Sequence, residues 1–196
     1  MAFPLVAFAF WLGAFAPAPL RADPDPITQS RFDFETGVLW HFTGSASPLD
    51  YVIQPQMLSF IGPVNWQWPL GGGDLIIRPR FSLLWEPIIQ GPEHHYYAGS
   101  ASCLAEWWNH QRSECLFFTS GGGLGWIDAK GQQIAGAQGQ EFNLNWLIYS
   151  GVRLRVAPRW TTSLGVYFQH VSNGHFNKVD PGIDAIGPML NAGWQF

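Results

Sequence analysis

The carboxyl-terminal part of the chain contains three residue types that could together carry out acyl transfer. In the stretch HVSNGHF (170–176), His170 stands two positions before Ser172, and Asp184 follows after a loop. A serine hydroxyl is a weak nucleophile near neutral pH, but an adjacent imidazole can take its proton and later return it to a leaving alcohol. A carboxylate can orient that imidazole and stabilise its cation. Three such side chains in contact would be the reacting groups of an esterase; the simpler alternative is a polar strand end.

Strand periodicity predicts where these groups lie, because residues i and i+2 of a strand project from the same face. In segment 160–173, one face contains Leu164, Val166, Phe168, His170 and Ser172. In segment 182–196, one face contains Asp184, Ile186, Leu190, Trp194 and Phe196. The apolar residues mark the side that faces lipid, where polar groups are costly and indicate a function. A hairpin between the two segments would bring all three polar groups onto one patch of that outer side.

Eight segments of the chain read as strands of this kind. They are 31–43, 51–62, 74–88, 94–106, 115–128, 141–157, 160–173 and 182–196. The clearest of them exceed the usual strand length of about 5–6 residues and match the roughly 9–11 residues of a tilted membrane-spanning strand. Their faces alternate between apolar and polar or small residues, as in barrels with lipid outside and a polar interior. The sequence therefore predicts an all-β fold, an eight-stranded antiparallel outer-membrane β-barrel.

The polar faces of these segments carry charges that would meet inside the barrel. The inward arginines are expected at Arg31, Arg78, Arg80, Arg153 and Arg155. The inward acids available to pair with them are Asp33, Glu35 and Glu86. Because eight strands leave an interior that side chains can fill, we expect a packed polar core and no pore.

Composition agrees with an exported membrane protein. Only 12% of residues are charged, against about 25% in typical soluble domains, and 16% are aromatic. Residues 1–22 read as a secretory signal peptide cleaved after Ala22, with a membrane anchor as the alternative, and residues 23–196 as one barrel domain. The net charge of −4 gives no indication of nucleic-acid binding.

The two cysteines, Cys103 and Cys115, flank an intervening stretch symmetrically. We expect them at opposed positions of a hairpin, where an exported protein could join them in a disulfide. Two free buried thiols are the alternative. Their spacing fits no metal site.

The residues HVSNGHFNKVDPGID (170–184), followed by a strand that ends in Phe196, resemble the PagL-type lipid A 3-O-deacylases. The family pattern maps onto His170, Ser172, Asn173, Gly182, Ile183 and Asp184. SGGGLGW (120–126) is similar to the glycine-rich strand of such proteins. The resemblance implies an eight-stranded outer-membrane barrel with a triad on its outer wall.

By this resemblance, Ser172 would be the nucleophile, His170 the general base and Asp184 the orienting acid. The backbone N–H of Asn173 would serve the oxyanion hole. The substrate would be the 3-position acyl ester of lipid A in lipopolysaccharide, hydrolysed without a metal or organic cofactor. The chain departs from the family in having Asp184 where the best-known members carry Glu, and Asp180 where they carry Asn.

Other readings of the same residues stay open at this stage. The chain could be a non-catalytic small outer-membrane barrel that binds lipid or a surface partner, or an ester hydrolase that acts on phospholipid. A homodimer is also open. The loop residue His175 could contact a lipid phosphate, although loop side chains are usually only solvated.

Overall fold

The computed structural model describes residue 25, residues 28–42 and residues 47–196. The segment expected to be a signal peptide, 1–22, lies outside the described residues. Strands account for nearly all the regular structure of the described part: β1 (Arg31–Gly37), β2 (Leu39–His41), β3 (Val52–Ile53), β4 (Gln56–Ile61), β5 (Trp66–Leu70), β6 (Gly73–Gln90), β7 (His95–Asn109), β8 (Glu114–Ile127), β9 (Phe142–Ala157), β10 (Trp160–Ser172) and β11 (Ile183–Gln195). Within the same described residues, we find no helix long and apolar enough to cross a membrane.

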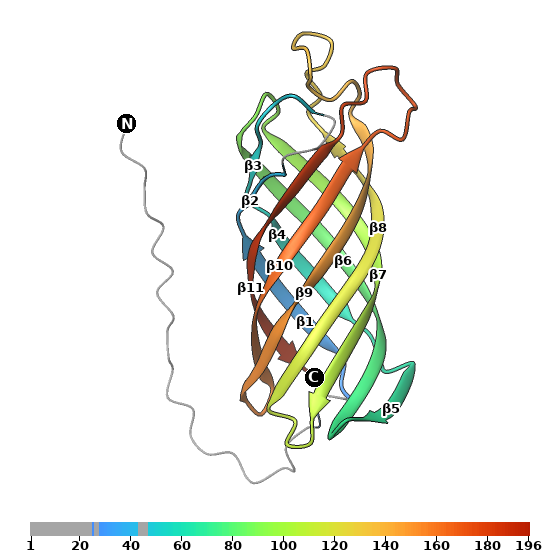
Figure 1. Ribbon diagram of the computed structural model, residues 1–196, viewed down its shortest axis with the longest axis vertical. Coiled ribbons are helices and arrows are strands. Elements are labelled where there is room, and N and C mark those ends of the chain that lie inside the picture. The colour runs from blue at the N-terminus through green and yellow to red at the C-terminus, as the bar shows by residue number, and fades with distance from the viewer. Residues whose placement is uncertain (1–24, 26–27, 43–46) are drawn as a thin grey trace, which may run out of the picture.

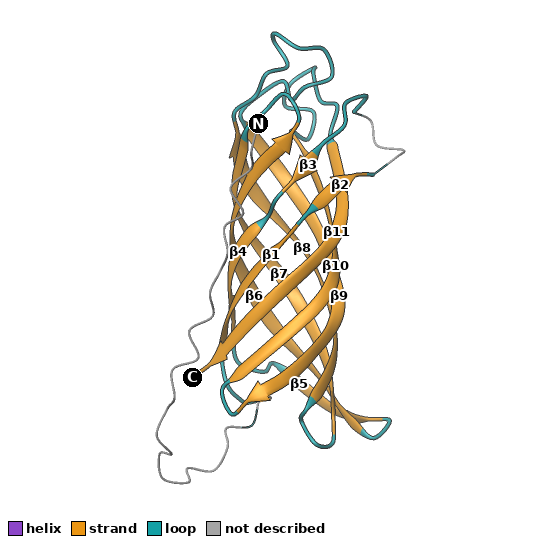
Figure 2. Cartoon of the chain, turned by 90° about the vertical axis from the view of Figure 1, so that its left-hand side faces the viewer, coloured by secondary structure: helices purple, strands orange, loops and turns teal. Residues whose placement is uncertain are grey.

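The strands close into one antiparallel barrel (Figures 1 and 2). β1 and β2 together make one crossing of the wall, and β3 and β4 make another. The six long strands β6 to β11 complete the set, and β1 closes the circle by pairing with both β4 and β11. The eight crossings coincide with the eight predicted segments, so the predicted fold class is confirmed.

β5 is an element that the sequence analysis did not predict. It pairs only with the first residues of β6, from Trp66 opposite Ile77 to Leu70 opposite Gly73. The resulting hairpin projects from the end of the barrel that carries the short turns and the carboxyl terminus (Figure 1). The long loops, including 128–141 and 173–182, lie at the opposite end.

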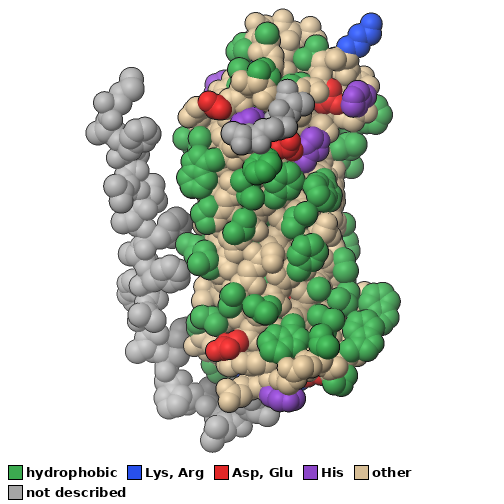
Figure 3. Space-filling model, in the orientation of Figure 1, with side chains coloured by type: hydrophobic (Ala, Val, Ile, Leu, Met, Phe, Trp, Pro, Cys, Tyr) green, Lys and Arg blue, Asp and Glu red, His purple; other side chains and the backbone are tan. Residues whose placement is uncertain are grey.

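The outer wall is apolar, as the alternation predicted (Figure 3). Large hydrophobic side chains that are about half exposed lie on every side of the barrel; examples are Phe34, Leu58, Leu83, Leu116, Trp146, Leu164 and Leu190. In water such a surface would aggregate, whereas in a bilayer it contacts hydrocarbon.

The barrel interior is a buried network of opposite charges. Glu106 is surrounded by three arginines: Arg31 Nη2 at 2.8 Å, Arg78 Nε at 3.3 Å and Arg153 Nε at 3.5 Å from its carboxylate oxygens. Asp33 accepts from Arg31 Nε at 2.8 Å and from Arg153 Nη2 at 3.0 Å. The arrangement agrees with the packed polar core that the sequence predicts.

Two details of the predicted interior are wrong. Arg155 lies near the end of β9, only partly buried, where its guanidinium donates to the carbonyl of Pro158 in the following turn. The main acidic partner, Glu106, was not among the predicted inward acids, although its position on β7 gives it a fully buried side chain. The other two acids are placed as predicted: Glu35 pairs with Arg80, and Glu86 accepts from Gln169 Nε2 at 2.6 Å.

We expect Glu106→Gln to lower the free energy of unfolding by about 3 kcal/mol, because it removes the carboxylate that compensates three buried cations. The change keeps the side-chain volume, so packing is not the cause of the loss. Urea unfolding of the barrel in detergent micelles measures it. Glu141→Gln, at an exposed loop residue, is the matched control. Equal stability of both variants and the wild type would contradict this account of the core.

The expected hairpin pairing of the cysteines is wrong. Cys103 lies opposite Ser120, and Cys115 lies opposite Trp108. Four residues separate β7 from β8, so odd-numbered residues of β7 pair with even-numbered residues of β8. Paired residues share a face of the sheet, so two odd-numbered residues, one on each strand, project from opposite faces. Cys103 is therefore exposed on the outer wall, Cys115 is buried inside, and both thiols are free.

Candidate active site

His170 and Asp184 are joined by a short hydrogen bond on the outer wall. They are direct partners in the β10–β11 register, close to the end where the loop 173–182 connects the strands. His170 Nδ1 lies 2.6 Å from Asp184 Oδ1, and their side chains are 39% and 21% exposed. A carboxylate can only accept, so Nδ1 carries the proton and Nε2 is left as an acceptor. The direct cross-strand position explains how an aspartate reaches the ring.

Ser172 projects from the same face of β10, two residues beyond His170. Its backbone partner on β9 is Leu144, and its side chain is half-buried. Residues i and i+2 of a strand are about 6–7 Å apart at Cα, a gap that their side chains can bridge by rotation. In the described part of the chain, His170 is hydrogen-bonded to Asp184, and no hydrogen bond joins Ser172 to His170. The structure therefore brings two predicted residues into contact and sets the third beside them.

Aromatic side chains adjoin the His–Asp pair on the wall. Trp146 is the β9 partner of His170, and its ring packs edge-on against Phe168 with centroids 5.8 Å apart. Phe168 also contacts Phe42, at 6.3 Å. These rings form an apolar surface directly next to the polar groups, on which a hydrocarbon chain can lie.

The backbone N–H of Asn173, expected to serve an oxyanion, donates to a carboxylate. It bonds Asp180 Oδ1 at 2.8 Å, and the N–H of His175 bonds Asp180 Oδ2 at 2.9 Å. The Asp180 side chain is only 6% exposed, whereas that of His175 is 93% exposed. The Asn173 amide group donates to the carbonyl of Val179 at 2.7 Å, which ties the two ends of the loop together.

Gly182 supports the His170 ring from the side of the loop. It has a φ of +67°, and a Cβ built there would lie 3.2 Å from His170 Cε1. A side chain at this position would strain the backbone and press against the ring.

With His170 in the general-base role expected from the sequence, Gly182→Ala should lower kcat for the expected ester hydrolysis about tenfold, because small displacements of a general base are costly. Steady-state kinetics in detergent measures the effect. Gly71→Ala is the matched control: Gly71 has a φ of +56° and nothing within 4 Å of its would-be Cβ, at the far end of the barrel. Equal losses in both variants would show that backbone strain alone is responsible.

A second His–Asp pair lies at the same end of the barrel and was missed by the sequence analysis. His94 Nδ1 lies 2.7 Å from Asp128 Oδ2, and the N–H groups of His94 and His95 donate to Asp128 Oδ1. Burial alone would raise the pKa of Asp128, but these hydrogen bonds hold it below its usual value. The residue two positions after His94 is Tyr96, and its side chain is buried. The second pair therefore has no exposed hydroxyl at the position that Ser172 occupies relative to His170. Nothing in the spacing of these residues in the sequence indicates the pair.

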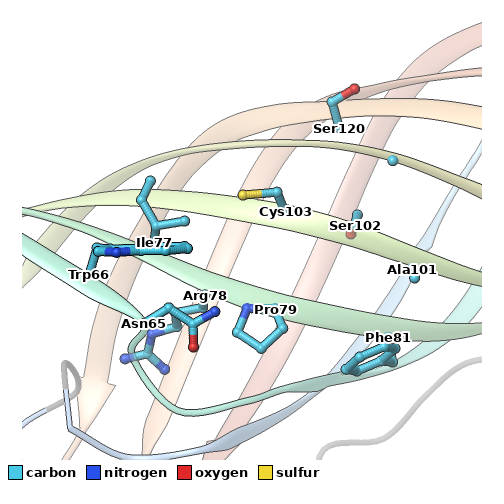
Figure 4. A pocket seen from close by; sticks show the side chains of 11 residues that line it. Asn65, Trp66, Ile77, Arg78, Pro79, Phe81, Ala101, Ser102, Cys103 and Ser120 are labelled. Atoms are coloured by element: carbon cyan, nitrogen blue, oxygen red, sulfur yellow. The ribbon is translucent and has the colours of Figure 1, made fainter.

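A groove lies elsewhere on the wall. It has a volume of about 390 Å³ and runs over β6, β7 and β8 beneath Trp66 of β5, with Pro79, Phe81 and Cys103 among its lining residues (Figure 4). None of the predicted site residues lines it. Within the described part of the chain, no three His, Cys, Asp or Glu side chains lie close enough together to hold a metal ion.

Comparison with known proteins gives a family match and a similar fold. A family model described as lipid A 3-O-deacylase (PagL) matches residues 58–193, a range that includes every predicted site residue. The crystal structure of the outer membrane enzyme PagL superposes with a TM-score of 0.58 at 15% identity, covering 84% of this chain and 99% of that one. Ail, the attachment invasion locus protein of Yersinia pestis, gives a TM-score of 0.46 at 10% identity, over 86% of this chain and 97% of Ail. No curated protein sequence matches the chain.

Proposed function

This chain belongs to the lipid A 3-O-deacylase (PagL) family, and we propose that it is a serine esterase that hydrolyses the 3-position acyl ester of lipid A. The family is one of hydrolases, and the chain is an outer-membrane β-barrel. The observation that carries the proposal is the 2.6 Å hydrogen bond between His170 and Asp184, formed on the lipid-facing wall beside Ser172.

The chemistry starts with transfer of the Ser172 proton to His170 Nε2 as Oγ attacks the ester carbonyl carbon. Asp184 holds Nδ1–H and stabilises the imidazolium that results. The tetrahedral oxyanion collapses, the bond to the sugar oxygen breaks, and His170 returns the proton to that oxygen. Water then attacks the acyl-enzyme with His170 again as base, which releases the fatty acid and restores Ser172.

The position of the three groups suits a substrate that is itself a lipid. Outer-membrane barrels have short periplasmic turns and longer extracellular loops, so the loop 173–182 marks the extracellular end. The groups therefore lie at the level of the outer leaflet, where lipid A resides. An acyl chain next to the wall can rest on Trp146 and Phe168 while its ester meets Ser172. Polar side chains on a lipid-facing wall are costly, and this use accounts for them.

The test is incubation of the purified barrel in detergent with lipid A, followed by mass spectrometry of the lipid and of released fatty acid. The proposal predicts loss of one acyl chain, from position 3, and no further loss from lipid A that already lacks it. Phospholipid in a parallel reaction should stay intact. Cleavage of phospholipid alone would reassign the substrate, and unchanged lipids in all reactions would support a non-catalytic binding barrel.

A further inference from the structure

In the loop after Ser172, two backbone N–H groups bind one carboxylate. The N–H groups of Asn173 and His175 converge on the two oxygens of Asp180, at 2.8 and 2.9 Å. Gly174 and His175 have φ angles of +60° and +63°. The left-handed turn at these two residues points the N–H groups of Asn173 and His175 at the same carboxylate, and we call this pair of donors the nest. The buried carboxylate of Asp180 is the anion that this nest holds.

One of these two N–H groups belongs to Asn173, the residue that directly follows Ser172 in the chain. The N–H of the residue that follows a nucleophilic serine is a usual donor to the tetrahedral intermediate, and here that residue is Asn173. Such donors act only if they point at the developing charge and are free to bind it. In this structure the donor is bound to a negative charge of the protein itself.

We propose that Asp180 is an inhibitory carboxylate that occupies the oxyanion site of Ser172. The inference rests on the proposed function, since it assigns a role within that reaction. With Asp180 in place, the intermediate has no free N–H at Asn173 and meets a like charge nearby. The reaction then proceeds only when the carboxylate leaves the nest, so Asp180 limits the rate of the chemical step.

The other role open to Asp180 is that of a structural support for the loop. Two hydrogen bonds to backbone N–H groups would order residues 173–180 in either case. The two roles predict opposite effects of Asp180→Asn, which keeps the size and one acceptor oxygen but removes the charge and adds an N–H₂ group. A support would be weakened by the change, and an inhibitor would be relieved.

The experiment compares wild type, Asp180→Asn and Asp180→Ala for kcat and KM on lipid A, and for the rate at which an alkyl fluorophosphonate labels Ser172. We expect Asp180→Asn to raise kcat and the labelling rate about tenfold with little change in KM, since a single oxyanion donor is worth about 10²–10³-fold in kcat. Asp180→Ala should show a smaller rise, because it frees the N–H groups without adding a donor. Asp128→Asn is the matched control, a loop carboxylate that also accepts from two backbone N–H groups, and should match wild type.

The labelling rate separates the inference from the proposed substrate. Faster labelling of Asp180→Asn with no cleavage of lipid A by any variant supports the inhibitory role and overturns the substrate assignment. Rates of Asp180→Asn at or below wild type, with the barrel folded and Asp128→Asn normal, overturn the inhibitory role even if lipid A is cleaved. Absence of labelling at Ser172 in every variant overturns both.

Discussion

Replacing Ser172 by Ala should lower kcat for deacylation by about 10⁴-fold or more while the barrel stays folded. In the proposed mechanism, the hydroxyl of Ser172 is the group that forms the covalent bond with the acyl chain. Ser172 makes no side-chain hydrogen bond among the described residues, so its loss should leave stability unchanged. The measurement is initial-rate release of fatty acid from lipid A, with unfolding in urea as the check on the fold.

The matched control is Ser150→Ala. Ser150 is a serine on the outer wall too, an exposed one on β9, and its hydroxyl donates to the carbonyl of Phe117 at 3.0 Å. It should lose no more than a small part of kcat. A Ser172→Ala protein that deacylates at a rate near wild type would require another nucleophile and would remove Ser172 from the mechanism.

The second large effect is expected from Asp184→Asn, which should lower kcat about 10³-fold with little change in KM. The carboxylate accepts from His170 Nδ1 at 2.6 Å and so leaves Nε2 free to take the serine proton. An amide can instead donate to Nδ1, which moves the ring proton to Nε2 and blocks it as a base. Asp184→Glu keeps the charge and should retain more activity than the Asn variant. Steady-state kinetics of the three proteins measures the difference.

Asp128→Asn is the control for this prediction, because Asp128 also bonds a histidine at Nδ1, that of His94, at the same end of the barrel. Its activity should equal that of the wild type. Similar losses in the two variants would mean that loss of any such pair disturbs the loop end of the barrel, and Asp184 would then have no particular role in the reaction.

Much of the fold could be predicted from the sequence because period-two alternation assigns each strand residue to the wall or the interior. That rule placed His170, Ser172 and Asp184 on the outer wall and Asp33 and Glu35 inside, and the structure agrees in each case. The rule fails near strand ends, where Arg155 reaches the turn. It also gives no pairing register, and the register decides that Cys103 meets Ser120 and not Cys115.

Features that depend on loop conformation were beyond prediction from the sequence. β5 contains Pro69 and is followed by three glycines, so it reads as a turn region, and only its pairing with β6 makes it a strand. The contact of Asp180 with the Asn173 N–H depends on left-handed residues at 174 and 175. That Asp180 departs from the family pattern is visible in the sequence, but only the structure shows which groups its carboxylate binds.

The most direct test of the central claim is a search for the acyl-enzyme itself. The protein is mixed with lipid A, quenched in acid within the first turnover, digested and analysed by mass spectrometry. The account predicts that the peptide containing Ser172 gains the mass of one lipid A acyl chain, that the added mass maps to the Ser172 oxygen, and that it disappears when turnover is completed. Release of fatty acid at full rate with this peptide never acylated would contradict the account.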